Sequence, residues 1–112
     1  MIRGVGVDAV PVARMRLALA RSPRLAERVF TSHELETAAQ RASRDASLAA
    51  RFAAKEAARK ALGATIAWRA VEVVSSRNRV PALRVQGHED VRFHLSLTHT
   101  DDVAVAVVLA ES

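Results

Sequence analysis

Asp8, Glu56 and Lys60 are the residues whose types and spacing could serve phosphate chemistry. Asp8 follows the run 4–7, which reads Gly-Val-Gly-Val, while Glu56 and Lys60 stand one helical turn apart further along the chain. Mg²⁺ is usually held by a carboxylate or two together with substrate phosphates, because it keeps several of its waters. A lysine beside the ion would add the charge stabilisation that phosphoryl transfer requires.

Each of these residues also has a structural interpretation. Asp8 could be a ligand at the end of a strand, where Gly4 and Gly6 leave open space on the same face, or a turn aspartate or N-cap before Pro11. Glu56 and its neighbours could belong to an ordinary exposed helix with salt bridges. Two acids about fifty residues apart do not define a metal site by spacing alone.

The stretch 50–63 is predicted to be a helix, because it consists of strong helix formers and ends at a capping glycine, Gly63. Alanines form one face of this helix, and such a seam allows another backbone to approach closely. The seam residues are Ala50, Ala54, Ala57 and Ala61. Arg51, Lys55 and Arg59 are expected to line a separate face.

Further helices are expected before this one. The first runs from Pro11 to about Arg21, and a short helix follows it. The inward residues of the first helix are expected to be Val12, Met15, Leu17 and Leu19. The sequence 31–34 is a capping box that starts another helix, which fades around 41–44 before Ser43 or Asp45 caps the long helix.

Alternating apolar residues predict five strands, at 1–10, 70–74, 82–85, 93–100 and 103–109. The second and third strands are joined across 75–81, which carries the turn residue Asn78, and 86–92 is a short polar connector. His94 and His99 differ in strand parity, so they should point to opposite faces and make a poor shared metal site. The predicted fold is α+β, with an N-terminal strand, a helical block around one long central helix, and a mainly antiparallel sheet.

The composition limits the classes of function. We expect a single domain over 1–112, since half of the 112 residues are hydrophobic and 26% are charged. The net charge of +5, almost entirely from arginine, favours an anionic partner such as nucleic acid, a phosphorylated small molecule or an acidic protein. The lack of cysteine excludes disulfides and thiolate metal sites. With no signal-peptide core and no membrane-spanning run, we expect a cytoplasmic protein without a membrane partner.

Four segments resemble, in order and approximate spacing, the holo-acyl-carrier-protein synthases, a small bacterial class of 4′-phosphopantetheinyl transferases. These segments are Gly-Val-Gly-Val-Asp at 4–8, Arg-Val-Phe-Thr at 28–31 with Glu34, the long motif at 51–63, and His-Leu-Ser-Leu-Thr-His-Thr at 94–100. The resemblance covers nearly the whole chain. It implies the phosphopantetheinyl transferase fold and a homotrimer with active sites between subunits.

The resemblance also implies an activity. Such an enzyme moves the phosphopantetheine arm of coenzyme A to a serine of an acyl carrier protein, of fatty-acid or polyketide type, and releases adenosine 3′,5′-bisphosphate. By similarity, Asp8 and Glu56 would hold Mg²⁺ and Lys60 would contact phosphate oxygens. Arg51 and Lys55 would lie near the nucleotide and its 3′-phosphate, or would orient Glu56.

Other roles follow from the same resemblance. His99 would line the coenzyme A site, and the serine proton would pass to Asp8 or to a metal-bound water, which the sequence does not separate. A basic face would dock the acidic helix of the carrier protein, in contacts that weaken with salt, or it is merely a solvated face. The residues of this face are Arg14, Arg21, Arg24 and Arg28.

Two departures from the family and two alternatives accompany this interpretation. The loop 63–66 keeps only the first glycine of the usual Gly-Thr-Gly, and the helix usual in the family at 86–92 is missing. A nucleic-acid-binding module is disfavoured because stacking aromatics are few. A carrier-binding remnant without turnover is disfavoured because Asp8, Glu56 and Lys60 are all present.

Overall fold

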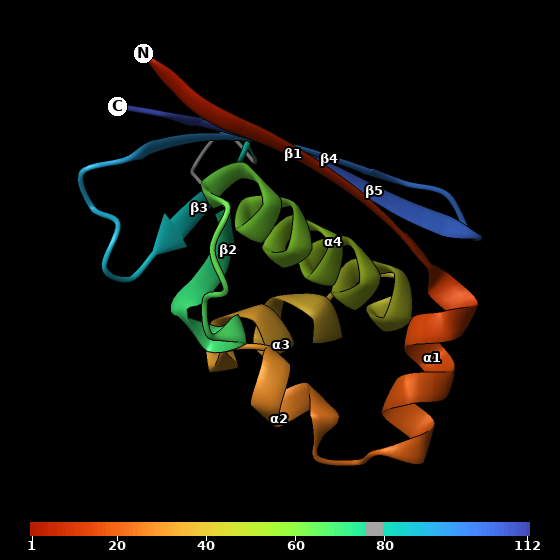
Figure 1. Cartoon of the computed structure of the whole chain (residues 1–112). Coiled ribbons are helices and arrows are strands. Elements are labelled where there is room, and N and C mark those ends of the chain that lie inside the picture. The colour runs from red at the N-terminus through yellow and green to blue at the C-terminus, as the bar shows by residue number, and fades with distance from the viewer. Residues whose placement is uncertain (76–79) are drawn as a thin grey trace.

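Helix α4 (Arg44–Leu62) lies across one face of a three-stranded antiparallel sheet and forms the centre of the fold (Figure 1). The strands β1 (Ile2–Pro11), β5 (Val103–Glu111) and β4 (Arg92–His99) follow one another across the sheet in that order. β5 is therefore the middle strand, and β1 and β4 are opposite edges. The predicted α+β fold with an antiparallel sheet is confirmed.

A second, two-stranded sheet pairs β2 (Val71–Ser75) with β3 (Pro81–Val85). The computed structural model describes residues 1–75 and 80–112, so the expected turn at Asn78 lies outside the described residues. Both ends of β2 and both ends of β3 lie within one residue of their predicted bounds.

Three short helices, α1 (Val12–Arg21), α2 (Leu25–Val29) and α3 (Ser32–Ala39), connect β1 to α4. The capping box at the start of α3 is confirmed, since Thr31 and Glu34 each accept from the other's backbone amide. α3 ends at Ala39, earlier than predicted. A 3₁₀ turn, η1 (Trp68–Ala70), leads from α4 into β2.

Helix α4 begins and ends where its caps predict. The Ser43 side chain accepts from the amide of Ala46, which leaves Asp45 inside the first turn. Gly63 adopts the left-handed conformation with φ 64° and closes the helix. In the described part of the chain, no helix has the length and apolar character needed to cross a membrane.

The alanine seam of α4 packs directly on the two glycines of β1. A Cβ atom on Gly4 would lie 2.0 Å from the carbonyl oxygen of Ala61, and one on Gly6 would lie 1.9 Å from that of Ala57. The close backbone approach predicted for the seam is confirmed. The expectation of open space on the glycine face is wrong, because the backbone of α4 fills it and carries its own side chains up to β1.

The start of α1 also differs from expectation. Pro11 is the N-cap of α1 and not a residue of its first turn, and it makes no side-chain capping bond. Leu17, predicted to point inward, is 55% exposed, whereas Val12 and Met15 are buried. Helix α1 therefore buries only a narrow stripe, and most of its surface is free to face a partner.

The two faces of the large sheet differ in what covers them. α4 buries the inner side of β5 completely, from Ala104 to Ala110 at alternate positions. On the outer side, Val5 and Val7 of β1 and Val107 of β5 stay more than 40% exposed. Val7 and Val107 are direct partners in the register, so the exposed valines form one apolar surface.

Candidate functional site

Asp8 and Lys60 meet where β1 crosses the C-terminal half of α4. Asp8 lies within β1, paired in register with Ala106, so it is neither a turn residue nor the N-cap of α1. The Nζ of Lys60 donates to Asp8 Oδ1 at 3.1 Å and to the carbonyl of Val7 at 3.0 Å. Asp8 stays partly open to solvent and Lys60 is exposed, so this pair can separate when a ligand arrives.

Glu56 stands one turn before Lys60 and is half-buried. Within residues 1–75 and 80–112, its carboxylate forms no ion pair and accepts no hydrogen bond. A half-buried carboxylate without a partner, close to the strand that carries Asp8, suits a hard divalent cation. Across the described residues, no three or more acidic or imidazole side chains gather into a metal cluster, so the rest of such an ion's shell would come from water and substrate.

Lys55, which was expected to lie near the nucleotide or to orient Glu56, occupies the interior. Its side chain is fully buried, and its Nζ lies 2.8 Å from Glu34 Oε1. The same ammonium donates to the carbonyl of Trp68 at 3.0 Å and to the carbonyl of Val71. Burial lowers the pKa of Lys55, and the neighbouring Glu34 partly offsets that effect. A fully buried ammonium does not contact a bound nucleotide in this arrangement.

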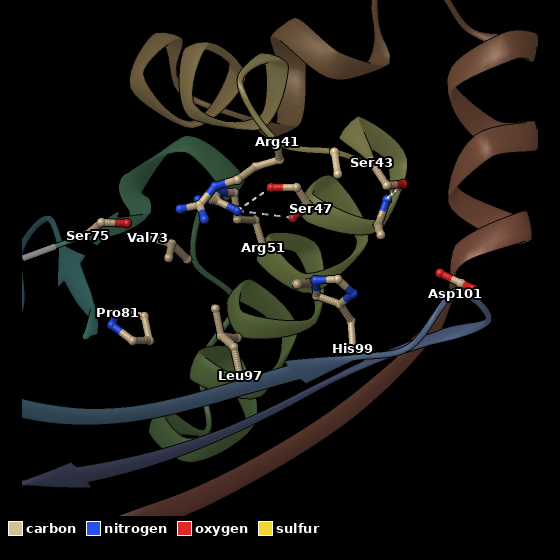
Figure 2. Close-up of a pocket in the computed structure, with 13 residues that line it drawn as sticks. Arg41, Ser43, Ser47, Arg51, Val73, Ser75, Pro81, Leu97, His99 and Asp101 are labelled. Carbon is tan, nitrogen blue, oxygen red and sulfur yellow. Dashed lines mark hydrogen bonds between the residues drawn. The ribbon is translucent and has the colours of Figure 1, made fainter. Parts of the chain in front are cut away.

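A cavity of about 510 Å³ opens on the opposite side of α4, between its N-terminal half, β2 and the end of β4 (Figure 2). Arg51, also expected near the nucleotide or orienting Glu56, is buried in its wall. Its Nη1 donates to the hydroxyl of Ser47 at 2.5 Å and to the Ser47 carbonyl at 3.3 Å. Its buried Nε has no hydrogen-bond partner within the described ranges, so the wall contains a donor that a bound anion could satisfy.

The formally charged residues that line this cavity in the described part of the chain are Arg41, Arg51 and Asp101. Burial lowers the pKa of the Arg51 guanidinium, and the nearby charge of Arg41 lowers it further. Arg41 and Ser47 line the cavity but were not predicted from the sequence. Only their spacing in the sequence could have indicated a place in the site, because Ser47 precedes Arg51 by one helical turn and Arg41 precedes the N-cap of α4.

The two histidines of β4 point to opposite faces, as their parity predicted. His99 lines the cavity together with Leu97 of the same face (Figure 2). His94 lies on the outer face, where its Nε2 is 3.1 Å from Glu111 Oε1. That hydrogen bond lowers the pKa of Glu111.

The arginines of the predicted docking face are all exposed and lie on or just before α1 and α2: Arg14, Arg21, Arg24 and Arg28. Arg14 also borders a second, mainly apolar cavity of about 140 Å³. Met15, Leu25 and Phe52 form part of its wall. The surface therefore combines positive charge with a small apolar recess.

The carboxylate site and the cavity face different sides of one subunit. Arg51 and Glu56 are five residues apart, which turns their side chains about 140° away from each other around α4. Asp8 belongs to β1 and His99 to β4, and these strands are opposite edges of the sheet.

Comparison with known proteins identifies relatives over the full chain. Residues 4–108 match the model of the 4′-phosphopantetheinyl transferase superfamily. The holo-[acyl-carrier-protein] synthases of Streptomyces griseus and Salinispora arenicola are each 45% identical to this chain, with 99% of both chains covered. Both alignments span 121 positions against 112 residues here. The segment 86–91 between β3 and β4 contains turns and no helix.

Solved structures share the fold. A holo-(acyl-carrier-protein) synthase from Bacillus anthracis, determined in complex with CoA (3′,5′-ADP), matches with a TM-score of 0.88 at 32% identity and covers 100% of this chain and 98% of its own. The holo-[acyl-carrier-protein] synthase from Neisseria meningitidis matches with a TM-score of 0.90 at 29% identity, with 100% of both chains covered. The similarity therefore extends over the sheet, α4 and the short helices together.

Proposed function

The chain belongs to the 4′-phosphopantetheinyl transferase superfamily, and we propose that its residues 1–112 form one domain that transfers 4′-phosphopantetheine from coenzyme A to a serine of an apo acyl carrier protein. The serine Oγ bonds to the phosphorus that carries the pantetheine arm. The bond from that phosphorus to the bridging oxygen breaks, and adenosine 3′,5′-bisphosphate leaves with the electron pair. The observation that carries this proposal is the meeting of Asp8 and Lys60 one turn after Glu56, whose carboxylate has no partner within residues 1–75 and 80–112.

The residues of the carboxylate site divide the work of the transfer. Asp8 and Glu56 would hold Mg²⁺, which supplies charge neutralisation on the pyrophosphate oxygens when bound. Lys60 exchanges its bond to Asp8 for a phosphate oxygen and stabilises the charge that develops there. The serine proton would pass to Asp8, whose carboxylate remains partly open to solvent, or to a water held by the ion.

The cavity of Figure 2 is the proposed nucleotide site. Arg51 and Arg41 would receive a phosphate of the adenosine bisphosphate, and the buried Nε of Arg51 would gain a hydrogen bond that it lacks. His99 closes the β4 side of the cavity and adds a further donor. The complex of the Bacillus anthracis relative with CoA (3′,5′-ADP) supports a coenzyme A ligand.

A homotrimer would bring the carboxylate site of one subunit and the cavity of another together around one substrate. In a cyclic assembly, the β1 edge of one subunit meets the β4 edge of the next, so each interface joins Asp8 and Glu56 to the cavity of its neighbour. The exposed valines of the outer sheet face, among them Val7 and Val107, would be buried at the same time. Three equivalent sites per trimer follow from this arrangement.

The exposed arginines of α1 and α2 would dock the acidic helix of the carrier protein. Their charge gives steering and orientation, and the apolar recess beside Arg14 accepts an apolar side chain of the partner. The reaction rate at low carrier concentration should therefore fall as salt is added.

Mass spectrometry of an apo carrier protein incubated with this protein, coenzyme A and Mg²⁺ tests the proposal. We expect the mass of one phosphopantetheine to be added, and EDTA to prevent the addition. Glu56→Ala should abolish transfer while its circular dichroism stays that of the parent. No added mass with the parent, or full addition in EDTA, would contradict the proposed reaction.

A further inference from the structure

Two cations follow Glu56 within about one turn of α4, yet neither pairs with it in the described residues. Arg59 is three residues away and Lys60 is four, which are the spacings at which a glutamate and a cation on a helix normally meet. Lys60 is directed to Asp8. Arg59 also makes its contacts away from Glu56, and these contacts explain why it does not pair with that carboxylate.

Arg59 is held by the segment that follows α4. Its guanidinium carbon lies 3.3 Å from the ring centre of Trp68, and tryptophan is the aromatic residue that binds a cation best. Its Nε and Nη2 both donate to the carbonyl of Ile66, at 2.9 and 2.5 Å. A stacked guanidinium with a forked bond has little freedom to turn towards another residue.

Trp68 is itself fixed on α4 by residues on both sides of Glu56 in the sequence. Its ring packs against Phe52 with centroids 5.1 Å apart, and its carbonyl accepts from the buried Lys55 at 3.0 Å. Phe52, Lys55 and Arg59 thus anchor one tryptophan from three positions of the helix. Glu56 lies among these positions but takes part in none of the contacts.

We propose that Trp68, with the carbonyl of Ile66, sequesters Arg59 and so keeps the carboxylate of Glu56 free to bind a divalent cation. Trp68 and Arg59 are positioning residues in this account, since they act through Glu56 and touch neither substrate nor metal. The inference rests on the proposed function, in which Asp8 and Glu56 hold the cation. It gives Arg59, which the sequence explains only as a solvated residue, a defined place beside the site.

The test measures Mn²⁺ binding by electron paramagnetic resonance, with coenzyme A present and no carrier protein, so that turnover is not the readout. In Trp68→Leu the freed Arg59 should compete for Glu56 and weaken Mn²⁺ binding about threefold to tenfold. Trp68→Leu combined with Arg59→Ala should restore binding to the parent value. Arg59→Ala alone should bind Mn²⁺ no more weakly than the parent.

A charge-matched control separates competition by Arg59 from simple loosening of the chain. Trp68→Leu with Arg59→Lys keeps the positive charge and should stay as weak as Trp68→Leu alone. Unchanged binding in Trp68→Leu, or a double variant with Arg59→Ala that stays weak, would overturn the inference. If Trp68→Leu does not fold by circular dichroism, Trp68→Met takes its place with the same expectations.

The outcome for this inference is distinguishable from the outcome for the proposed function. A parent that modifies the carrier protein and binds Mn²⁺, with variants that do not follow the predicted order, removes only the role of Trp68 and Arg59. A parent that binds no Mn²⁺ in the presence of coenzyme A contradicts the cation site, and the inference with it.

Discussion

Two lysines little more than a turn apart on α4 each form an ion pair with a carboxylate of another element, and the two pairs differ in their surroundings. Lys55 meets Glu34 at 2.8 Å with both side chains fully buried. Lys60 meets Asp8 at 3.1 Å with side chains 52% and 20% exposed. The chemical groups are the same, so the surroundings alone decide what each pair does.

The buried pair joins four parts of the fold. Glu34 accepts from the amides of Thr31 and Val73, while Lys55 donates to the carbonyls of Trp68 and Val71. Every strong donor and acceptor is occupied, so nothing is left for a ligand. The exposed pair has few other contacts, and water can replace either partner. Burial thus separates Lys55, which has a structural role, from Lys60, for which we propose a role in binding phosphate.

Removing the buried cation should have the largest effect on stability. Lys55→Met leaves the Glu34 carboxylate without its partner in the interior, and we expect a loss of about 3–5 kcal/mol in the free energy of unfolding. The matched control Lys60→Met should lose about 0–1 kcal/mol, because its pair is solvated. Urea denaturation measures both, and equal losses would abolish the contrast between the two pairs.

Lys60, whose substitution should have the smaller effect on stability, should be the more important of the two lysines for the chemical step. Lys60→Met should lower the rate constant of transfer about 10²- to 10³-fold, because a donor to developing phosphate charge is removed. Its secondary structure should not change. Single-turnover transfer to an apo carrier protein gives the rate, and a Lys60→Met rate near that of the parent would exclude Lys60 from the site.

A double substitution should show whether charge or packing gives the buried pair its effect on stability. Lys55→Met together with Glu34→Gln removes both charges, so the uncompensated carboxylate of the single variant is gone. We expect the double variant to regain about 2 kcal/mol of the free energy of unfolding relative to Lys55→Met. If the double variant loses as much free energy of unfolding as the two single variants lose together, then charge is not the reason why Lys55 stabilises the fold.

A third, still more exposed pair should show the smallest effect. The hydrogen bond with His94 holds the pKa of Glu111 below its ordinary value of 4.5, so the ionised carboxylate stabilises the fold above pH 4.5 and that contribution is lost as the pH falls. His94→Gln should return the pKa of Glu111 towards 4.5. NMR titration of Glu111 measures the shift, and an unchanged pKa would show that His94 is not its cause.

Much of the fold was predictable from local signals. The caps at Ser43 and Gly63, the capping box before α3 and the period-two strands all act within a few residues, so a single sequence displays them. The end of α3 was misplaced because Gln40 to Ala42 carry no strong stop signal. Leu17 was misassigned because periodicity gives the apolar residues of a helix but not how wide a stripe its neighbours cover.

The candidate site was predictable only in part. Asp8 and Lys60 do meet, but the reason is the contact of Gly4 and Gly6 with the alanine seam, a long-range packing that local patterns do not reveal. Lys55 could not be separated from Lys60 by residue type, since its burial depends on Glu34 and on the course of the chain after Gly63. The diversion of Arg59 to Trp68 depends on the same course.

We propose that each active site combines the carboxylates of one subunit with the cavity of the next. Co-expression of Glu56→Ala with Arg51→Met, each nearly inactive alone, tests it directly in a transfer assay at low coenzyme A. Random mixing in a cyclic assembly would give about a quarter of the parent's sites both intact halves, so we predict about a quarter of the parent's activity. Activity no higher than that of the separate variants would contradict the shared site.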